Sequence, residues 1–258
     1  MRVFFVVLAR DSSLILGKIK ELESFGYPYV IVCGERFSHP NVVFKRPVGK
    51  YDAINFSLNY IPVETDVVVF NDVDAEINNF ACALELFEKS DISLVYAKVR
   101  VEFGPQLLFY RFLDALRRWV PIAASGELVL LRYEALRRVL PLKRCKSEDS
   151  YILFKVLENG GRIAFCEDCF VRTLRTLHAK QEEAYKRRTT GGIYQALSMT
   201  KTSFLVRVFY AFLPFVSPLL LLTGKKGYYW SKGIIQGIVD YVRGDSAGTW
   251  VPNYSDDS

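Results

Sequence analysis

The sequence predicts an α/β fold with a mainly parallel sheet flanked by helices, and three observations support this prediction. Short apolar, β-branched runs alternate with longer stretches of helical periodicity from residue 3 onward. These runs are apolar at consecutive positions, which is typical of strands that are covered on both faces. The 258 residues are 50% hydrophobic and 24% charged, so the chain carries too much apolar surface to remain disordered.

The individual elements follow from these patterns and from the residues that interrupt them. We expect Gly26 to end the first helix and Gly34 to follow the second strand, because glycine accepts the conformations found at such ends. The expected strands are 3–9, 29–33, 42–44 and 66–70, and the expected helices are 14–25, 51–60, 80–87 and 150–157. In parallel sheets ligands bind beyond the carboxyl ends of the strands, so the residues after each strand are the first candidates for a site.

The five cysteines are scattered and odd in number, which favours a reducing compartment over a disulfide framework. Cys166 and Cys169 form one CxxC, but the sequence has no second pair at zinc spacing, so we interpret them as structural thiols. The apolar run at 3–9 is short for a signal peptide and lacks a clear cleavage site. We therefore interpret it as a buried first strand.

Two carboxylates follow the expected strand at 66–70. If the extended conformation persists, the two-residue period places Asp72 and Asp74 on the same side of the chain. Adjacent carboxylates repel each other unless a cation neutralises them, and Mg²⁺ or Mn²⁺ shared with substrate phosphates is the natural partner. The alternative is an ordinary turn rich in aspartate. The position between a buried strand and an apolar helix favours the metal and phosphate site.

A second acidic pair, Glu148 and Asp149, lies at the start of the expected helix at 150–157. Ser147 is the expected N-cap, which places both carboxylates in the first helical turn. One interpretation is that they complement the helix dipole. The other is that a carboxylate at this position is a general base that deprotonates an acceptor hydroxyl near a metal-bound leaving group. Taken alone, the pair favours the first interpretation.

Four segments, taken in order, carry a resemblance to a known family. They are GKYDAIN at 49–55, VVFNDVD at 68–74, SGELVLLRYEAL at 125–136 and SED at 147–149. They resemble motifs of the family 2 glycosyltransferases, which are inverting enzymes of the GT-A fold that use nucleotide sugars. The resemblance runs from residue 1 to about residue 245. It implies a fold of the GT-A type and a sugar transfer from a nucleotide-sugar donor.

The resemblance assigns roles to the acidic residues. It implies that Asp72 and Asp74 hold the metal ion, Mg²⁺ or Mn²⁺, and the donor diphosphate. It also implies that Asp149, the aspartate of the SED motif, is the catalytic base, with Glu148 beside it in the catalytic pair. His178 lies between this motif and a cluster of arginines, where some GT-A enzymes place another metal ligand, so it is a further candidate ligand.

Further candidates for donor binding lie close to the ends of the first strands. Ala9 and Asp11 end and follow the first strand, although Asp11 also suits the start of a helix. Glu35 stands one position from the aspartate with which the family contacts the nucleotide base. Lys50 follows a glycine in a loop and can reach the nucleotide, or it is simply an exposed lysine.

Arg188 is the last candidate for donor binding. It matches a single position of the Q-x-x-R-W motif of processive family members, so the sequence does not indicate polymer synthesis. Its planar guanidinium suits a diphosphate, and a solvated basic helix start is the alternative. Trp119 is either an acceptor contact or a packing residue.

The composition changes beyond residue 202. The run 204–222 is nearly all apolar and borderline in length for a membrane span, and Pro214 and Pro218 interrupt it. We expect a kinked, re-entrant or interfacial helix pair. Residues 186–243 carry nine basic side chains and one acidic side chain, which suits an anionic cytoplasmic membrane surface. A helical hairpin packed on the catalytic domain or on a dimer partner is the alternative, and no motif indicates nucleic acid.

These observations predict a GT-A catalytic domain at 1–200 and a C-terminal membrane-associated helical segment at 201–258. The predicted function is metal-assisted transfer of a sugar from a nucleotide sugar to a lipid-linked or other membrane-proximal acceptor, such as a glycan. A polyprenyl-phosphate sugar synthase is the alternative within the class. A sugar-phosphate nucleotidyltransferase is disfavoured because the glycine-rich signature is absent from 8–13. A non-catalytic scaffold is disfavoured by the intact acidic residues.

Overall fold

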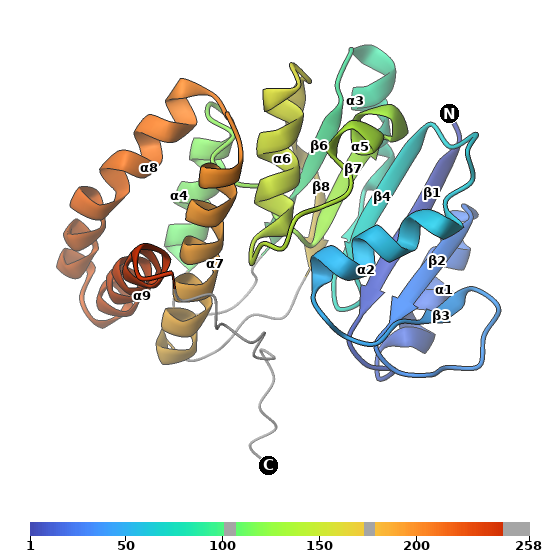
Figure 1. Cartoon of the computed structure of the whole chain (residues 1–258), viewed down its shortest axis with the longest axis horizontal. Helices are drawn as coiled ribbons and strands as arrows, with labels where there is room; N and C mark the ends of the chain where they lie inside the picture. Colours follow the sequence, from blue (N-terminus) through green and yellow to red (C-terminus); the bar gives the residue numbers. More distant parts are fainter. Residues whose placement is uncertain (101–106, 173–178, 245–258) are drawn as a thin grey trace.

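The computed structural model describes residues 1–100, 107–172 and 179–244. These residues form an eight-stranded sheet in the order β3-β2-β1-β4-β7-β6-β8-β5, with helices on both faces (Figure 1). The strands are β1 (Val3–Ala9), β2 (Tyr29–Cys33), β3 (Val42–Phe44), β4 (Val67–Asp72), β5 (Glu76–Asn78), β6 (Leu94–Arg100), β7 (Leu128–Arg132) and β8 (Ile163–Arg172).

The sheet is mainly parallel, as the sequence predicts. β1 pairs in parallel with β2 and β4, β2 with β3, and β6 with β8. β7 is antiparallel to both of its neighbours, and the short β5 is antiparallel to β8. Because β7 runs against β4, its first residue, Leu128, lies opposite Asn71 near the end of β4. The loop that enters β7 is thereby placed at the carboxyl edge of β1 and β4.

The helices are α1 (Ile15–Phe25), α2 (Lys50–Ser57), α3 (Phe80–Lys89), α4 (Leu107–Arg117), α5 (Tyr133–Val139), α6 (Glu148–Glu158), α7 (Ala179–Met199), α8 (Phe204–Val216) and α9 (Lys225–Val242). Short 3-10 helices cover Leu58–Tyr60 and Ser217–Thr223. The helix expected at 51–60 therefore ends as an α-helix at Ser57 and continues as a 3-10 turn. The helix expected at 150–157 begins earlier, at Glu148.

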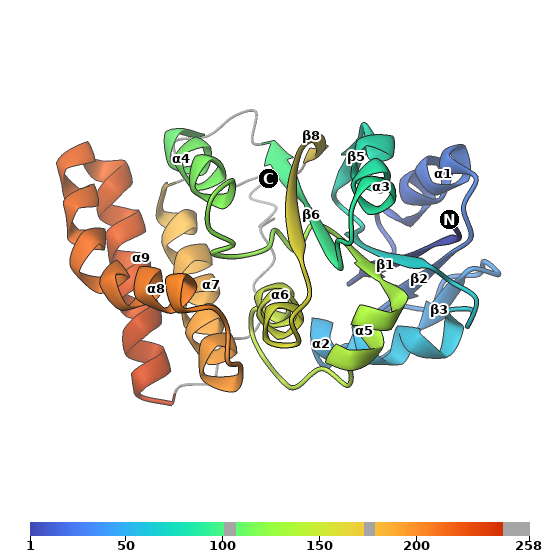
Figure 2. The same ribbon diagram turned by 90° about the horizontal axis from the view of Figure 1, so that it is seen from above.

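The alternation of side chains along β1 divides the core into two layers. Phe5 belongs to the layer that α1 and α3 cover, whereas Val6 belongs to the layer that α2, α5 and α6 cover. Figure 2 shows these two sets of helices on opposite sides of the sheet. Both faces of the central strands are therefore buried, which explains their consecutive apolar residues.

The C-terminal helices form a group beside the sheet (Figure 1). α9 packs closely on α7 because it presents glycine at the contact: a Cβ at Gly237 would lie 2.5 Å from the Arg187 carbonyl oxygen. The Arg187 guanidinium also donates two hydrogen bonds to the Asp240 carboxylate of α9, at 2.6 and 2.8 Å. α8 and the 3-10 helix after it lie on the outside of this group. The chain is thus broken into two helices near the expected prolines, as the sequence predicts.

Candidate functional site

The acidic candidates gather at one edge of the sheet, toward which β1 and β2 point in Figure 1. β1 and β4 are parallel and in register, so Leu8 lies opposite Asp72 at their carboxyl ends. α2 begins at Lys50 and α6 begins at Glu148, and the side chains of these two residues reach each other across the edge. The site is therefore built from three elements that are far apart in the sequence.

Asp72 and Asp74 differ from the expected geometry in one respect. β4 continues to Asp72, but the chain then turns, and the Ala75 N–H donates to the Asp72 carbonyl oxygen at 3.1 Å. Asp74 lies inside this turn, so the period of a strand does not relate the two carboxylates. They nevertheless interact, because the charge of Asp74 adds to burial in raising the pKa of Asp72 to about 6.

Lys50 joins the acidic residues into one cluster. Its Nζ lies 2.9 Å from Asp72 Oδ1 and 3.8 Å from Glu148 Oε1, and it donates to the Gly126 carbonyl oxygen at 3.1 Å. Burial alone would lower the pKa of Lys50, but the charges of Asp72, Glu148 and Asp149 outweigh this effect and raise it. The ammonium group is therefore charged and holds α2, β4, α6 and the loop before β7 together.

Glu148 and Asp149 occupy the first turn of α6, as the sequence predicts. Burial raises the pKa of Glu148, and the neighbouring charge of Asp149 raises it further while Lys50 opposes the shift. Asp149 is oriented by two donors to its Oδ1: the Ser147 hydroxyl at 3.0 Å and the Ser150 N–H at 2.8 Å. Ser147 holds the N-cap position but its side chain does not cap the helix, because its hydroxyl is engaged with Asp149.

Gly126 leaves room beside the second oxygen of Asp149. A Cβ at this position would lie 2.6 Å from Asp149 Oδ2 and 3.1 Å from Lys50 Nζ. The SGELVLLRYEAL segment that contains Gly126 therefore contributes a close backbone approach as well as strand β7. A larger residue here would displace the carboxylate, so the geometry of Asp149 depends on this glycine.

Sequence reasoning missed a buried lysine beneath the turn that carries Asp74. Lys18 of α1 is 3% exposed, and its Nζ donates to Asn71 Oδ1 at 2.7 Å and to the Ala75 carbonyl oxygen at 2.6 Å. It also pairs with Glu21 at 2.6 Å. Burial lowers the pKa of Lys18, whereas the charges of Glu21 and of the two aspartates above raise it. The sequence does contain a signal for it: Lys18 stands three residues after Ile15, on the apolar face of the helix, where an apolar residue is expected.

Glu21 and Asn71 complete the support of this turn. The Ile77 N–H donates to Glu21 Oε1 at 2.6 Å, so the carboxylate binds both Lys18 and the backbone beyond the turn. The Asn71 amide donates to the Glu127 carbonyl oxygen at 2.7 Å and to the Ala75 carbonyl oxygen at 3.2 Å. The turn is thereby fixed to α1 on one side and to the loop before β7 on the other.

The structure brings the candidates at the ends of β1 and β2 together. Glu35 Oε2 accepts from the Ser12 hydroxyl at 2.9 Å and from the Ser12 N–H at 3.1 Å. Asp11 accepts from the Ser13 hydroxyl and N–H, and these bonds lower its pKa. Ala9 ends β1 opposite Cys33, so all three candidates lie at the same edge as Asp72. Asp11 does not begin the first helix, because α1 starts at Ile15 and no side chain caps it, and its role in donor binding stays a prediction.

Arg188 lies on α7, one turn before Gly192, at which an added Cβ would lie 2.8 Å from the Ser147 backbone nitrogen. Its guanidinium lies over the Tyr185 ring, 5.7 Å from the ring centroid. His178 lies outside the described residues. The CxxC cysteines are both buried, and burial raises the pKa of each thiol, which agrees with a structural role.

The residues at the end of β4 fit a divalent cation of the Mg²⁺ or Mn²⁺ type. Within 1–100, 107–172 and 179–244 there is no cluster of three or more His, Cys, Asp and Glu side chains that could hold a metal. Two carboxylates are nevertheless the donor set that Mg²⁺ uses when water and substrate phosphates supply its other ligands. Burial raises the pKa of Asp72 despite its contact with Lys50, and the charge of Asp74 raises it further, so a cation bound here would stabilise the ionised carboxylates.

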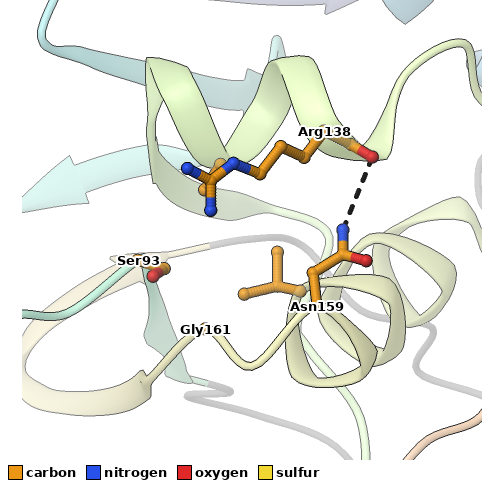
Figure 3. A pocket seen from close by; sticks show the side chains of 6 residues that line it. Ser93, Arg138, Asn159 and Gly161 are labelled. Carbon is orange, nitrogen blue, oxygen red and sulfur yellow. Dashed lines mark hydrogen bonds between the residues drawn. The ribbon is translucent and has the colours of Figure 1, made fainter.

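A small hollow elsewhere on the sheet does not contribute to this site. It encloses about 20 Å³ between Ser93, Arg138, Asn159 and Gly161, and the Asn159 amide donates to the Arg138 carbonyl oxygen across it (Figure 3). Ser93 and Gly161 precede β6 and β8, so the hollow lies at the opposite edge of the sheet. Its volume is about that of one water molecule.

The sequence matches no protein-family model and no curated protein. The structure, by contrast, resembles solved glycosyltransferases. It superposes on the mannosyltransferase PcManGT from Pyrobaculum calidifontis, solved with GDP-Man and Mn²⁺, with a TM-score of 0.63 and 18% identity over 96% of this chain and 76% of that one. It also resembles the glucosyl-3-phosphoglycerate synthase of M. tuberculosis, with a TM-score of 0.51 and 20% identity over 76% of this chain and 80% of that one.

The chain has a GT-A type fold. This confirms the fold implied by the four motifs, and the first match extends over the C-terminal helices as well as the sheet. At these identities the likeness concerns the fold alone. Membership of family 2 and the roles of individual residues remain predictions.

Proposed function

We propose that this protein is a metal-dependent, inverting glycosyltransferase that uses a nucleotide-sugar donor. The observation that carries the proposal is the cluster around Lys50, where Asp72 from β4 and Glu148 and Asp149 from α6 meet at the carboxyl edge of a GT-A type sheet. PcManGT, whose fold is similar, binds GDP-Man and Mn²⁺ in its crystal structure. These observations support a sugar-transfer site at this edge of the sheet.

In this proposal Asp72 and Asp74 hold the divalent cation. The cation, when bound, would neutralise charge that develops on the diphosphate leaving group. Asp149 receives the proton of the acceptor hydroxyl at Oδ2, the oxygen that faces Gly126, while Ser147 and Ser150 hold the other oxygen. Lys50 positions the carboxylates through its contacts with Asp72 at 2.9 Å and with Glu148 at 3.8 Å.

The test is release of nucleoside diphosphate from UDP- and GDP-sugars with Mn²⁺ or Mg²⁺ and a membrane lipid extract. We expect acceptor-dependent release from one donor class, and loss of release in both Asp74→Ala and Asp149→Asn. Asp91→Asn, a change at an exposed aspartate before β6, is the matched control and should retain activity. Absence of metal-dependent donor binding in the folded protein would contradict the proposal.

We further propose that the acceptor is lipid-linked and that the protein works at a membrane surface. Among the described residues, Phe204–Thr223 is the one helical stretch long and apolar enough to cross a membrane, and 17% of it is buried. Its large side chains face outward: Phe215 is 77% exposed and Leu222 is 86% exposed. Such a strip, followed at once by Lys225 and Lys226, suits the interface of an anionic bilayer.

Sedimentation with vesicles of phosphatidylcholine and phosphatidylglycerol tests the membrane proposal. Leu222→Glu should weaken binding, whereas Val63→Glu should not, because Val63 is also 86% exposed but lies before β4 in another part of the molecule. Equal binding by both variants would contradict the assignment of this strip to the membrane.

A polyprenyl-phosphate acceptor is the second candidate, and the same apolar strip favours it. A phosphate that is already ionised needs no general base, so Asp149 would position the acceptor instead. Retention of activity in Asp149→Asn together with loss in Asp74→Ala would select this alternative over a hydroxyl acceptor.

A further inference from the structure

A groove of about 480 Å³ lies where the end of α4 faces β6 and β8, on the face of the sheet that α6 covers. Its floor contains the rings of Tyr96 and Phe165, whose centroids are 5.2 Å apart. Its wall is the segment Arg117–Trp119, and Glu167 lines it from β8. We propose that this groove binds carbohydrate, with a sugar ring stacked on Trp119.

The indole of Trp119 is a large aromatic surface without a packing role. It is 84% exposed, in contrast to Trp230, which is 4% exposed and packs against the rings of α4. The backbone N–H of Trp119 donates to the Leu116 carbonyl oxygen at 3.0 Å, so the backbone that carries the ring continues the last turn of α4. The C–H face of a pyranose carries a small positive charge and packs well against the negative face of an aromatic ring.

The polar groups of the groove suit hydroxyl groups, which both donate and accept. Arg117 and Arg118 each pair with a carboxylate, from Asp114 and Glu167 respectively. Such pairs offer guanidinium donors and carboxylate acceptors side by side. The Nε–H of Arg117 is buried and makes no hydrogen bond, so the wall also has a donor that a ligand oxygen could satisfy.

The charge of the groove distinguishes carbohydrate from other ligands. Because both arginines are paired, the two positive and two negative charges at the groove cancel, and a phosphate group gains little there. A lipid chain would remove these ion pairs from water and offer no hydrogen bonds in return, which is unfavourable. A neutral ring with many hydroxyl groups is the ligand class that meets both conditions.

The groove lies on the face of the sheet that α6, the helix of the candidate base, also covers. The Tyr210 hydroxyl donates to the Ile122 carbonyl oxygen at 2.7 Å, in the segment that leads from the groove to Gly126. A Cβ at Gly126 would lie 2.6 Å from Asp149 Oδ2, so this segment connects the groove to the candidate base. On the basis of the proposed function, the ring bound here belongs to the acceptor, which would then carry sugar already.

Binding of the purified full-length protein to an array of defined oligosaccharides, without donor or metal, tests this proposal. The variant is Trp119→Ala, and Phe112→Ala is the matched control because Phe112 is a 64% exposed aromatic of α4 that does not line the groove. We expect retention of a defined set of glycans that Trp119→Ala weakens by about tenfold and Phe112→Ala leaves unchanged. Glu167→Gln should weaken it as well.

Three results are decisive. Retention of no glycan by the wild-type protein, or equal retention by Trp119→Ala, would overturn the proposal. Glycan binding that persists in Asp74→Ala, together with the loss of nucleoside diphosphate release, would support it. Glycan binding by a protein that binds no nucleotide sugar would leave the groove in place while the proposed function failed, so the two are tested separately.

Discussion

Replacement of Lys18 by methionine tests whether a buried ammonium group holds the turn that carries Asp74. Methionine occupies a similar volume but donates no hydrogen bond, so Asn71 Oδ1 loses its lysine donor and the Ala75 carbonyl oxygen keeps only the bond from the Asn71 amide. Removal of one member of a buried, hydrogen-bonded ion pair typically destabilises a protein by about 3–5 kcal/mol. The remaining member, Glu21, is 18% exposed in its side chain and is partly solvated, so we expect the lower end of this range, about 3 kcal/mol.

Urea unfolding measures the loss of stability, and calorimetric titration with Mn²⁺ and nucleoside diphosphate measures its consequence for the turn. We expect Lys18→Met to weaken metal binding as well as stability, because the turn between Asp72 and Ala75 loses its support from α1. Lys20→Met, an exposed neighbour on the same helix, is the control and should change stability by less than about 0.5 kcal/mol. Equal stability and equal metal affinity of the two variants would refute the reasoning.

Three further predictions follow from single positions. Gly126→Ala should lower turnover in the release assay about tenfold without loss of donor binding, because the added Cβ would lie 2.6 Å from Asp149 Oδ2. Gly17→Ala is the control, since a Cβ there would meet nothing within 4 Å. Gly237→Ala should lower the free energy of unfolding, measured in urea, by about 1–3 kcal/mol, because the added Cβ would lie 2.5 Å from the Arg187 carbonyl oxygen and push α9 away from α7. Mn²⁺ affinity should fall about tenfold per pH unit below about 6, where Asp72 takes up a proton, and calorimetry at pH 5 and pH 7 that gives equal affinities would contradict this.

Protonation of Asp72 also makes the stability of the metal-free protein depend on pH. The pKa of Asp72 is raised in the folded state from an ordinary value of 3.8 to about 6, so the folded state binds the proton more tightly than the unfolded state does. The contribution of this group to stability is therefore fully present below pH 3.8 and is lost as the pH rises through about 6. Stability and metal binding consequently respond to pH in opposite directions at this residue.

The fold could be predicted from the sequence because its signals are local. Consecutive apolar residues at 3–9 and 29–33 mark strands that helices cover on both faces, and Gly26 ends α1 in the left-handed conformation that glycine favours. The breaks in the C-terminal helices likewise follow from prolines and small residues. The exposure of the C-terminal helices could not be predicted in this way, since the same run of apolar residues suits a protein core and a bilayer.

The candidate site was only partly predictable, because its contacts join residues that are distant in the sequence. The motifs named Asp72, Glu148 and Asp149 individually, but the sequence gives no measure of how closely Lys50 approaches all of them. Asp74 illustrates the opposite error: a local rule, the strand period, was extended two residues beyond the end of β4, where the turn closed by Ala75 replaces the strand. Tertiary hydrogen bonds override local geometry at such positions.

In the proposed site, Lys50, a proton and a divalent cation would all act on the charge of the same carboxylates. Asp72, Glu148 and Asp149 share one ammonium group, so their negative charge exceeds the positive charge supplied by Lys50. Burial is the main cause of the raised pKa values of Asp72 and Glu148, and the neighbouring carboxylates raise them further while Lys50 opposes the shift. A proton relieves the excess negative charge one charge at a time, whereas a divalent cation relieves it without blocking Asp149. On the proposed function, this is why a divalent cation rather than a proton would complete the donor site at Asp72.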